Sequence, residues 1–148
     1  MSDSQSPEGH DPDDLVQVLL DRIALQADAD HQHIHLTERH GERGFSIVIG
    51  TVEASEIQRV VAGVEAERPL THRLLHQALT ACDVHLLGVD IVRLENGTFF
   101  AELRLARPDT AQEVGVDARP SDAIALAVRA KAPIRVSNRV LDAAGGEA

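Results

Sequence analysis

Residues 116–127 read VDARPSDAIALA, an extended segment that passes directly into a helix. Pro120-Ser121-Asp122 indicates the helix start, because proline fits the first helical position and Ser and Asp favour helix N-termini. From Ala123 onward the residues are apolar on all sides, which predicts a helix that is buried on most of its surface. A strand that leads straight into a core helix is therefore the unit around which the rest of the chain is expected to pack.

Antiparallel hairpins are predicted on the N-terminal side of this unit. Asn96-Gly97 separates two alternating apolar segments, and this dipeptide is a strong hairpin signal. A second hairpin surrounds the glycine-containing loop at residues 40–44. The expected strands are residues 33–37, 45–50, 84–94, 98–106, 112–118 and 134–136.

Helices are predicted at residues 53–64 and from Thr71 onward, with a last helical turn at residues 138–143. Thr71 is the expected cap of its helix. The faces expected to be buried are Ile57, Val60, Val61 and Val64 in the first helix, and Leu74, Leu75, Ala78, Leu79 and Cys82 in the second. The sequence thus predicts an α+β class, with a mixed, largely antiparallel sheet packed against about three helices.

Residues 15–26 allow two interpretations. Acids precede the segment, as they precede many helices. Its apolar residues nevertheless alternate in two short runs on either side of Asp21-Arg22, as they would in strands. Periodicity alone leaves both alternatives open.

The chain has 148 residues, enough for one domain with a single core. Residues 1–13 are acidic and poor in apolar side chains, which predicts a disordered leader. Residues 14–144 are expected to form the domain, and residues 145–148 a frayed tail.

Composition excludes several classes of protein. The net charge is −10, which argues against binding nucleic acid through a broad basic face. There are three Phe and no Trp or Tyr, so a base-stacking platform is not expected. The single cysteine, Cys82, excludes an intramolecular disulfide and a cysteine-based zinc site. No apolar run is long enough to span a bilayer, so a cytoplasmic protein without membrane partners is expected.

Four stretches of the chain resemble the bifunctional nuclease domain family, with order and spacing that agree over roughly residues 15–143. The matching stretches are residues 49–54, 68–75, 96–103 and 116–127. The resemblance implies strands at residues 15–26, DNase and RNase activity with nucleic acid as substrate, and a homo-oligomeric assembly. Residues 28–35, DADHQHIH, depart from the apolar strand that the family usually has there, so the N-terminal third is divergent.

The strongest candidate site is the strand-to-helix junction. Asp117 and Asp122 are predicted catalytic residues and hard oxygen ligands for a divalent metal, Mg²⁺ or Mn²⁺. Arg119, together with backbone N–H groups near Ser121 at the helix N-terminus, would hold a phosphate. The competing interpretation is local, because Ser and Asp commonly cap helices and Arg119 could simply pair with Asp117.

His72 completes the predicted catalytic set. It lies in the first turn of its helix, where the helix dipole favours a neutral imidazole that can activate water. Glu53 is the third predicted metal ligand. The alternative for His72 is a surface histidine beside a helix cap.

His31, His33 and His35 alternate, so in a strand they would share one face at a spacing suited to a transition metal. The alternative is a polar strand face turned to solvent. Two functions follow from the whole pattern. One is a metal-dependent nuclease that cleaves phosphodiester bonds in DNA and RNA; the other is a non-catalytic, homo-oligomeric binding or regulatory module.

Overall fold

The computed structural model of the chain describes residues 14–26, 30–110 and 112–145. The leader predicted at residues 1–13 and residues 146–148 of the predicted tail lie outside the described residues, whereas Gly145 ends the last helix. None of the described helices has both the length and the hydropathy needed to cross a bilayer. In chain order the elements are β1 (Leu15–Ala24), β2 (His31–Glu38), β3 (Gly44–Gly50), α1 (Thr51–Ala62), α2 (Thr71–Ala81), β4 (His85–Glu95), β5 (Thr98–Ala106), β6 (Glu113–Ala118), α3 (Pro120–Ala130), β7 (Ile134–Ser137) and α4 (Asn138–Gly145).

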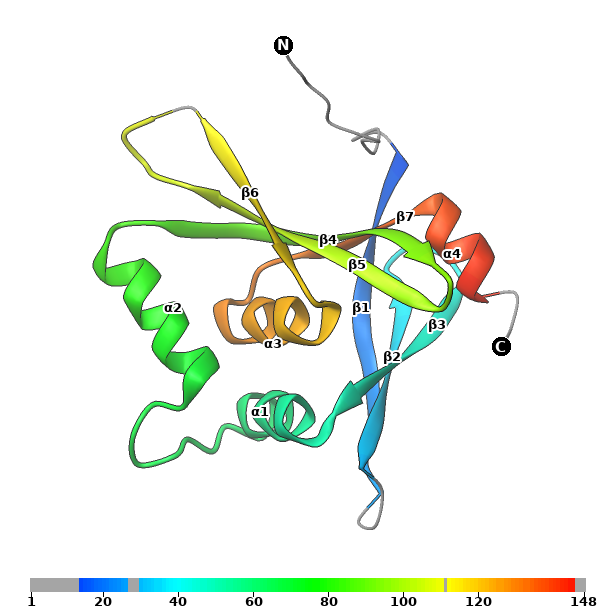
Figure 1. The fold of residues 1–148 in the computed structure, drawn as a ribbon, viewed down its shortest axis with the longest axis horizontal. Coiled ribbons are helices and arrows are strands. Elements are labelled where there is room, and N and C mark those ends of the chain that lie inside the picture. Colours follow the sequence, from blue (N-terminus) through cyan, green and yellow to red (C-terminus); the bar gives the residue numbers. More distant parts are fainter. Residues whose placement is uncertain (1–13, 27–29, 111, 146–148) are drawn as a thin grey trace.

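The described strands form one seven-stranded sheet in the order β3-β2-β1-β7-β4-β5-β6. Every neighbouring pair is antiparallel except β4 and β7, which run parallel. In Figure 1, α1 and α3 lie below the half of the sheet that contains β4 and β5, and α4 lies near β7 and β3. The expected α+β class with a mixed, largely antiparallel sheet is confirmed.

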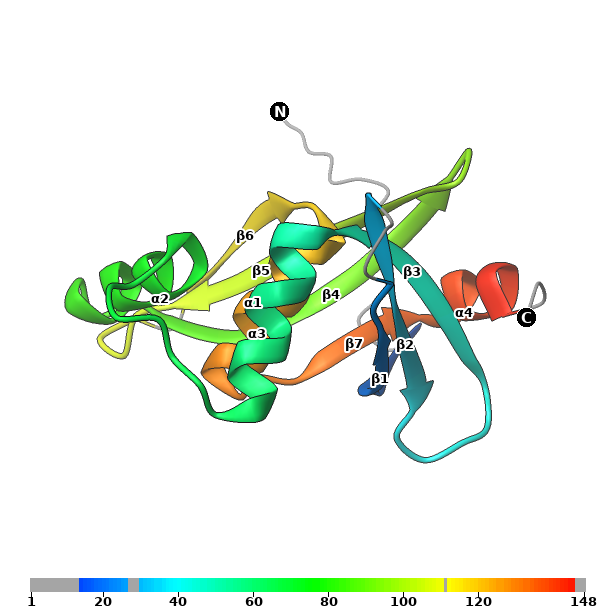
Figure 2. The ribbon, with the colours of Figure 1, turned by 90° about the horizontal axis from the view of Figure 1, so that it is seen from below.

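α3 is the central helix of the domain. Residues 123–127 are each at most 1% exposed. Figure 2 shows α1 in front of α3 and the sheet behind it, so α3 packs on both sides. The helix is apolar all round because it has neighbours in two directions.

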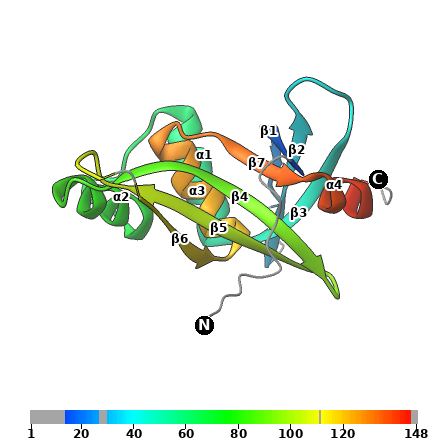
Figure 3. The same cartoon turned by 90° about the horizontal axis from the view of Figure 1, so that it is seen from above.

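The hairpin between β4 and β5 turns at Asn96-Gly97, as predicted. Both residues have positive φ angles, 53° for Asn96 and 81° for Gly97. Two consecutive residues in the left-handed region are typical of the tight turn that matches the twist of antiparallel strands, and Asn and Gly tolerate it best. In Figure 3, no described helix lies over the outer face of β4 and β5.

β1 decides the ambiguity at residues 15–26 in favour of a strand. It is one strand, and its register with β2 shifts between Leu20 and Arg22, so that Asp21 is an extra, bulged residue. The bulge occurs where the sequence predicted a break. Leu20 lies opposite Leu36, while Arg22 lies opposite His35.

The buried face predicted for α1 is correct for Ile57, which is fully buried, and wrong for Val61, which is 63% exposed. The other buried residues of the helix are Ala54 and Glu56. The helix is rotated because Glu56 pairs with Arg129 of α3, and an acid in that position could not be recognised as inward-facing from apolar spacing.

The buried stripe predicted for α2 is also wrong. Its only buried residue is His72, whereas Leu74 is 56% and Leu75 41% exposed, and Cys82 is exposed too. Thr71 is the first residue of the helix rather than its cap, since the N-cap position falls on Leu70. As in α1, a polar side chain turns inward because it has a partner on α3.

Candidate active site

The first turns of three helices meet at one place. Glu53 comes from α1, His72 from α2 and Asp122 from α3, and Arg119 immediately precedes α3. Arg119 donates from Nε to Asp122 Oδ2 at 2.9 Å and from Nη2 to Glu53 Oε2 at 3.2 Å. His72 Nε2 lies 2.8 Å from Asp122 Oδ1. Side chains from three distant parts of the sequence therefore form one continuous chain of contacts.

The connections between elements explain this meeting. β3 ends at Gly50 and α1 begins at the next residue, while β6 ends at Ala118, two residues before α3 begins. Because α1 packs against α3, the two helix starts approach each other from separate strands. α2 also packs against α3, which brings its first turn to the same place.

None of the three helices has a side-chain cap on its N-terminal N–H groups. The N-cap residues Gly50, Leu70 and Arg119 make no such hydrogen bond. A helix N-terminus carries a partial positive charge and unpaired N–H donors. Three of them together favour negative charge, which accounts for Glu53 and Asp122 in the first turns and would also suit a phosphate.

Asp122 is the electrostatic centre of the group. Burial on its own would raise the pKa of Asp122, but hydrogen bonds from Arg119 and His72 outweigh it, so the pKa lies below its ordinary value. The same carboxylate raises the pKa of Arg119. An ionised carboxylate can only accept hydrogen bonds, so His72 Nε2 carries the hydrogen and donates it. In the neutral ring, His72 Nδ1 is then the acceptor nitrogen.

The site is open at the arginine and nearly closed at the histidine. The side chain of Arg119 is 67% exposed and that of Asp122 is 34% exposed. The side chain of His72 is only 9% exposed. A ligand from solvent would therefore meet the guanidinium before it reached the imidazole.

The structure does not bring Asp117 to this group. Asp117 lies on β6 opposite Glu102, and the next residue, Ala118, lies opposite the buried Ala101. Alternation along the strand turns Asp117 to the outer face of the sheet, away from the helices. Ser121 lies in the first turn of α3 beside Asp122 and is 7% exposed.

The described residues contain no group of three or more His, Cys, Asp or Glu side chains arranged to hold a metal ion. Of the predicted ligands, Glu53 and Asp122 share Arg119, and Asp117 is on the other face of the sheet. The alternating histidines of β2 form no such group either, although the rings of His31 and His33 are 6.3 Å apart.

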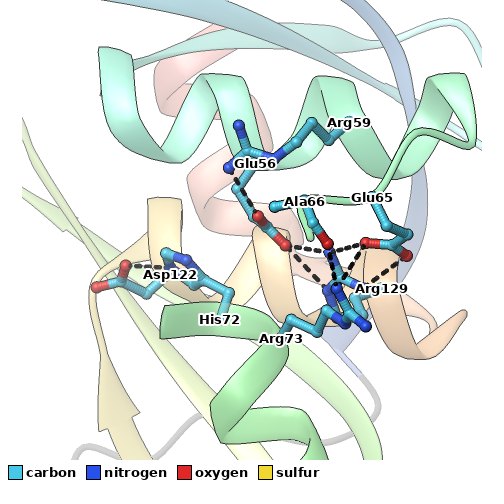
Figure 4. Close-up of polar contacts among 8 residues, drawn as sticks. All are labelled: Glu56, Arg59, Glu65, Ala66, His72, Arg73, Asp122 and Arg129. Carbon is cyan, nitrogen blue, oxygen red and sulfur yellow. Dashed lines mark hydrogen bonds and ion pairs between the residues drawn. The ribbon is translucent and has the colours of Figure 1, made fainter. Parts of the chain in front are cut away.

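The sequence interpretation missed an ion-pair network, which Figure 4 shows together with the His72–Asp122 contact. Glu56, 3% exposed, accepts a hydrogen bond from Arg129 Nε at 2.9 Å. Arg129 Nη1 donates to Glu65 at 3.1 Å, and Arg73 donates to the carbonyl oxygen of Ala66 at 2.9 Å. These contacts tie α1 and the segment after it to α2 and α3. The sequence feature that could have indicated this network is an acid beside apolar residues in the first half of α1.

Comparison with known proteins places these observations in a family context. A sequence model described as the bifunctional nuclease domain matches residues 34–148. Uncharacterized proteins from Mycobacterium tuberculosis strains CDC 1551 / Oshkosh and ATCC 25618 / H37Rv are each 43% identical over 110 residues, which is 74% of this chain and 64% of each relative. Bifunctional nuclease 1 of Arabidopsis thaliana is 28% identical over 92 residues, 62% of this chain and 28% of that protein. The chain thus spans less than two thirds of the length of these curated relatives.

Proposed function

This chain belongs to the bifunctional nuclease domain family, and from that premise we propose that it is a nuclease that hydrolyses phosphodiester bonds in DNA and RNA. The observation that supports the proposal is the contact chain at the three helix starts. An exposed guanidinium and a histidine are held by the same carboxylate, Asp122. Phosphodiester hydrolysis needs a cation for the phosphate and a base for the attacking water.

Arg119 would hold the scissile phosphate. Its Nε and Nη2 are fixed by Asp122 and Glu53, whereas Nη1 has no partner among the described residues. Backbone N–H groups in the first turn of α3 would add neutral donors beside it. Because two carboxylates already orient the guanidinium, little side-chain freedom is lost when the phosphate binds.

His72 would take the proton of the attacking water at Nδ1. Asp122 holds the ring through Nε2 and stabilises the imidazolium that forms, as the carboxylate does in other histidine–carboxylate pairs. The water oxygen bonds to phosphorus, and the bond from phosphorus to the leaving oxygen breaks. The leaving oxygen takes up a proton from solvent, and the His72 imidazolium releases its proton to solvent. The leaving strand then departs with a hydroxyl group.

A divalent metal, Mg²⁺ or Mn²⁺, remains a prediction. The donors do not fit it as they stand, because both oxygens of Asp122 have partners and Asp117 lies on the outer sheet face. Neither step above is therefore routed through a metal. Cleavage measured with Mg²⁺, with Mn²⁺ and with EDTA tests the prediction, since metal dependence requires that EDTA abolish cleavage.

The proposal is tested by cleavage of single-stranded DNA and RNA with purified wild type, His72→Gln and Arg119→Gln. We expect His72→Gln to lower kcat by about 100-fold or more, the usual contribution of a general base. His76→Gln is the matched control, because His76 lies one turn further along α2 and takes no part in the contact chain. If all variants cleave at the wild-type rate, the activity is a contaminant and the proposal is wrong.

The second candidate function is a non-catalytic, homo-oligomeric binding or regulatory module. It is favoured by one observation: Asp122 already has two protein partners, and His72 is nearly buried, as in a purely structural contact. If the chain is such a module, His72→Gln lowers the free energy of unfolding, and neither the wild type nor the variant cleaves nucleic acid. Urea unfolding of the same variants, measured beside the cleavage assay, separates the two functions.

A further inference from the structure

The outer face of β1, β2 and β3 carries basic side chains that the proposed reaction does not use. His33 and His35 project from this face, because Ile34 between them is fully buried in the core. Arg22 of β1 lies opposite His35 on one side, and Ser46 of β3 lies opposite it on the other. These three side chains form a row across three neighbouring strands.

The β-bulge at Asp21 places Arg22 in this row. Leu20 packs against the core, and in a regular strand Arg22, two residues further on, would point to the same side. The extra residue reverses the alternation, so that Arg22 faces outward and Ile23 lies opposite the buried Ile34. Bulges commonly redirect a side chain in this way, often beside functional sites.

A small hollow lies at this row. Its volume is about 50 Å³, and its lining consists of Arg22, Ala24, His33, Ile34, His35 and Ser46. This is several times the space that one water molecule needs. Ala24 lies opposite His33, where a longer side chain would fill the space. His35 Nδ1 and Ser46 Oγ are 3.0 Å apart, a hydrogen bond that fixes the imidazole ring.

We propose that this hollow binds a phosphate group through Arg22, His33 and His35. The lining offers guanidinium and imidazole N–H donors, which suit the oxygens of a phosphate. A metal cation is disfavoured, because it would lie beside a guanidinium and the described residues assemble no set of metal ligands. Arg22 and His33 precede residue 34, where the match to the family model begins.

Few negative charges compete with a phosphate there. Among the described residues, the one acid within ion-pair distance of the row is Asp21, whose Oδ2 lies 3.7 Å from Arg22 Nη1. Both side chains of that pair are about half or more exposed, so water screens it. His31 lies further along the same face of β2, and the residues that β3 contributes, Ser46 and Val48, are uncharged.

The test is a titration of the full chain with inorganic phosphate, followed by NMR of the histidine ring signals at pH 8 and pH 6. We expect saturable shifts for His33 and His35 but not for His40 in the hairpin loop. Binding is expected at both pH values, because the Arg22 guanidinium is positively charged at each. Absence of saturable shifts, or saturation by Zn²⁺ but not by phosphate, would overturn the proposal.

Two variants and a control sharpen this test. Arg22→Gln should weaken phosphate binding roughly tenfold, the loss expected for one charge-assisted hydrogen bond. Ala24→Leu should block the hollow while Arg22 stays in place. Arg39→Gln removes the same charge from an exposed position outside the row and should leave binding unchanged. Equal weakening by Arg22→Gln and Arg39→Gln would show only a general charge effect and would contradict the site.

The source of the phosphate is decided with two dinucleotides. If only a 5′-phosphorylated dinucleotide shifts the ring signals, the ligand is a terminal phosphate monoester. If the unphosphorylated dinucleotide acts equally, a backbone phosphodiester suffices, and if neither acts, the site takes free phosphate. The readout is binding rather than cleavage, so the outcome is independent of the proposed nuclease reaction.

Discussion

Arg119 is held by two carboxylates, Asp122 and Glu53, yet 67% of its side chain is exposed. Arg119→Lys keeps the positive charge but loses the planar fork that contacts both carboxylates and a phosphate together. We expect kcat/KM for a single-stranded oligonucleotide to fall at least about tenfold, while the unfolding temperature changes little because the residue is exposed. Steady-state kinetics and thermal unfolding check the two parts, and a lysine variant with wild-type kcat/KM would contradict the role of the guanidinium.

A second arginine–carboxylate pair makes stability depend on pH. Arg43 donates to both oxygens of Glu38, at 3.0 Å and 2.8 Å, and lowers the pKa of Glu38 from 4.5 to about 2. A carboxyl group whose pKa is lowered by folding stabilises the folded state above its unfolded pKa. This stabilisation should be complete above about pH 5 and should be lost as the pH falls through 4.5 towards 2.

Glu38→Gln measures that contribution. The variant should unfold at lower urea than wild type at pH 7, and the difference should shrink steadily between pH 4.5 and pH 2. Glu42→Gln is the control, because Glu42 lies in the same hairpin loop and is exposed. A wild-type–variant difference of constant size across this pH range would show that the carboxylate charge is not its cause.

The candidate site residues are predicted from separate parts of the sequence. Arg119 and Asp122 are predicted from the strand-to-helix junction, His72 from the first turn of its helix, and Glu53 from a stretch that the family resemblance includes. The structure brings these side chains together. The contact of His72 with Asp122 could not be predicted, because it joins residues 50 positions apart through the packing of α2 on α3. Asp117 was grouped with Asp122 by proximity in sequence, although the strand–helix boundary between them sends the two side chains to different sides of the sheet.

At the scale of elements, the Glu56–Arg129 pair joins α1 to α3 behind the site. Arg129→Met leaves the buried carboxylate with Arg59 alone and should lower the free energy of unfolding by about 3 kcal/mol, within the range for breaking a buried pair. Glu56→Gln combined with Arg129→Met should recover part of the loss, because no charge is then left buried. Urea unfolding of the single and double variants measures both values.

Arg59→Met is the matched control for that series. Arg59 contacts the same carboxylate at 3.1 Å, but its side chain is 29% exposed against 9% for Arg129. We therefore expect a smaller loss. If Arg129→Met and Arg59→Met lower the free energy of unfolding equally, the contact between α1 and α3 stabilises the protein no more than the contact within α1.

Local sequence signals predicted where helices and strands occur better than they predicted which face of each helix is buried. The hairpin at Asn96-Gly97 and the start of α3 depend on residues close in sequence, and both are confirmed. The inward faces of α1 and α2 depend on charged partners on α3, which apolar spacing cannot represent. Val61 of α1 and Leu74 and Leu75 of α2, all predicted to be buried, are consequently found on the surface.

For the molecule as a whole, exposed apolar side chains form surface that a single chain leaves uncovered. Leu74 and Leu75 on α2 are 56% and 41% exposed, and Leu70, just before the helix, is 47% exposed. On the edge strand β6, Val114 is 58% exposed. Figures 1 and 3 place α2 at the same end of the molecule as the start of β6. Monomeric proteins seldom expose large apolar patches, and edge strands are usually protected from pairing with other chains.

A homo-oligomer, which the family resemblance implies, would cover this end of the molecule. We expect light scattering and analytical ultracentrifugation to show more than one copy at micromolar concentration. Leu74→Glu should dissociate the assembly, whereas Leu19→Glu, at a 45% exposed position on β1, should not. A wild-type chain that sediments as a monomer at every concentration would show that the exposed leucines are not a contact between copies of this chain.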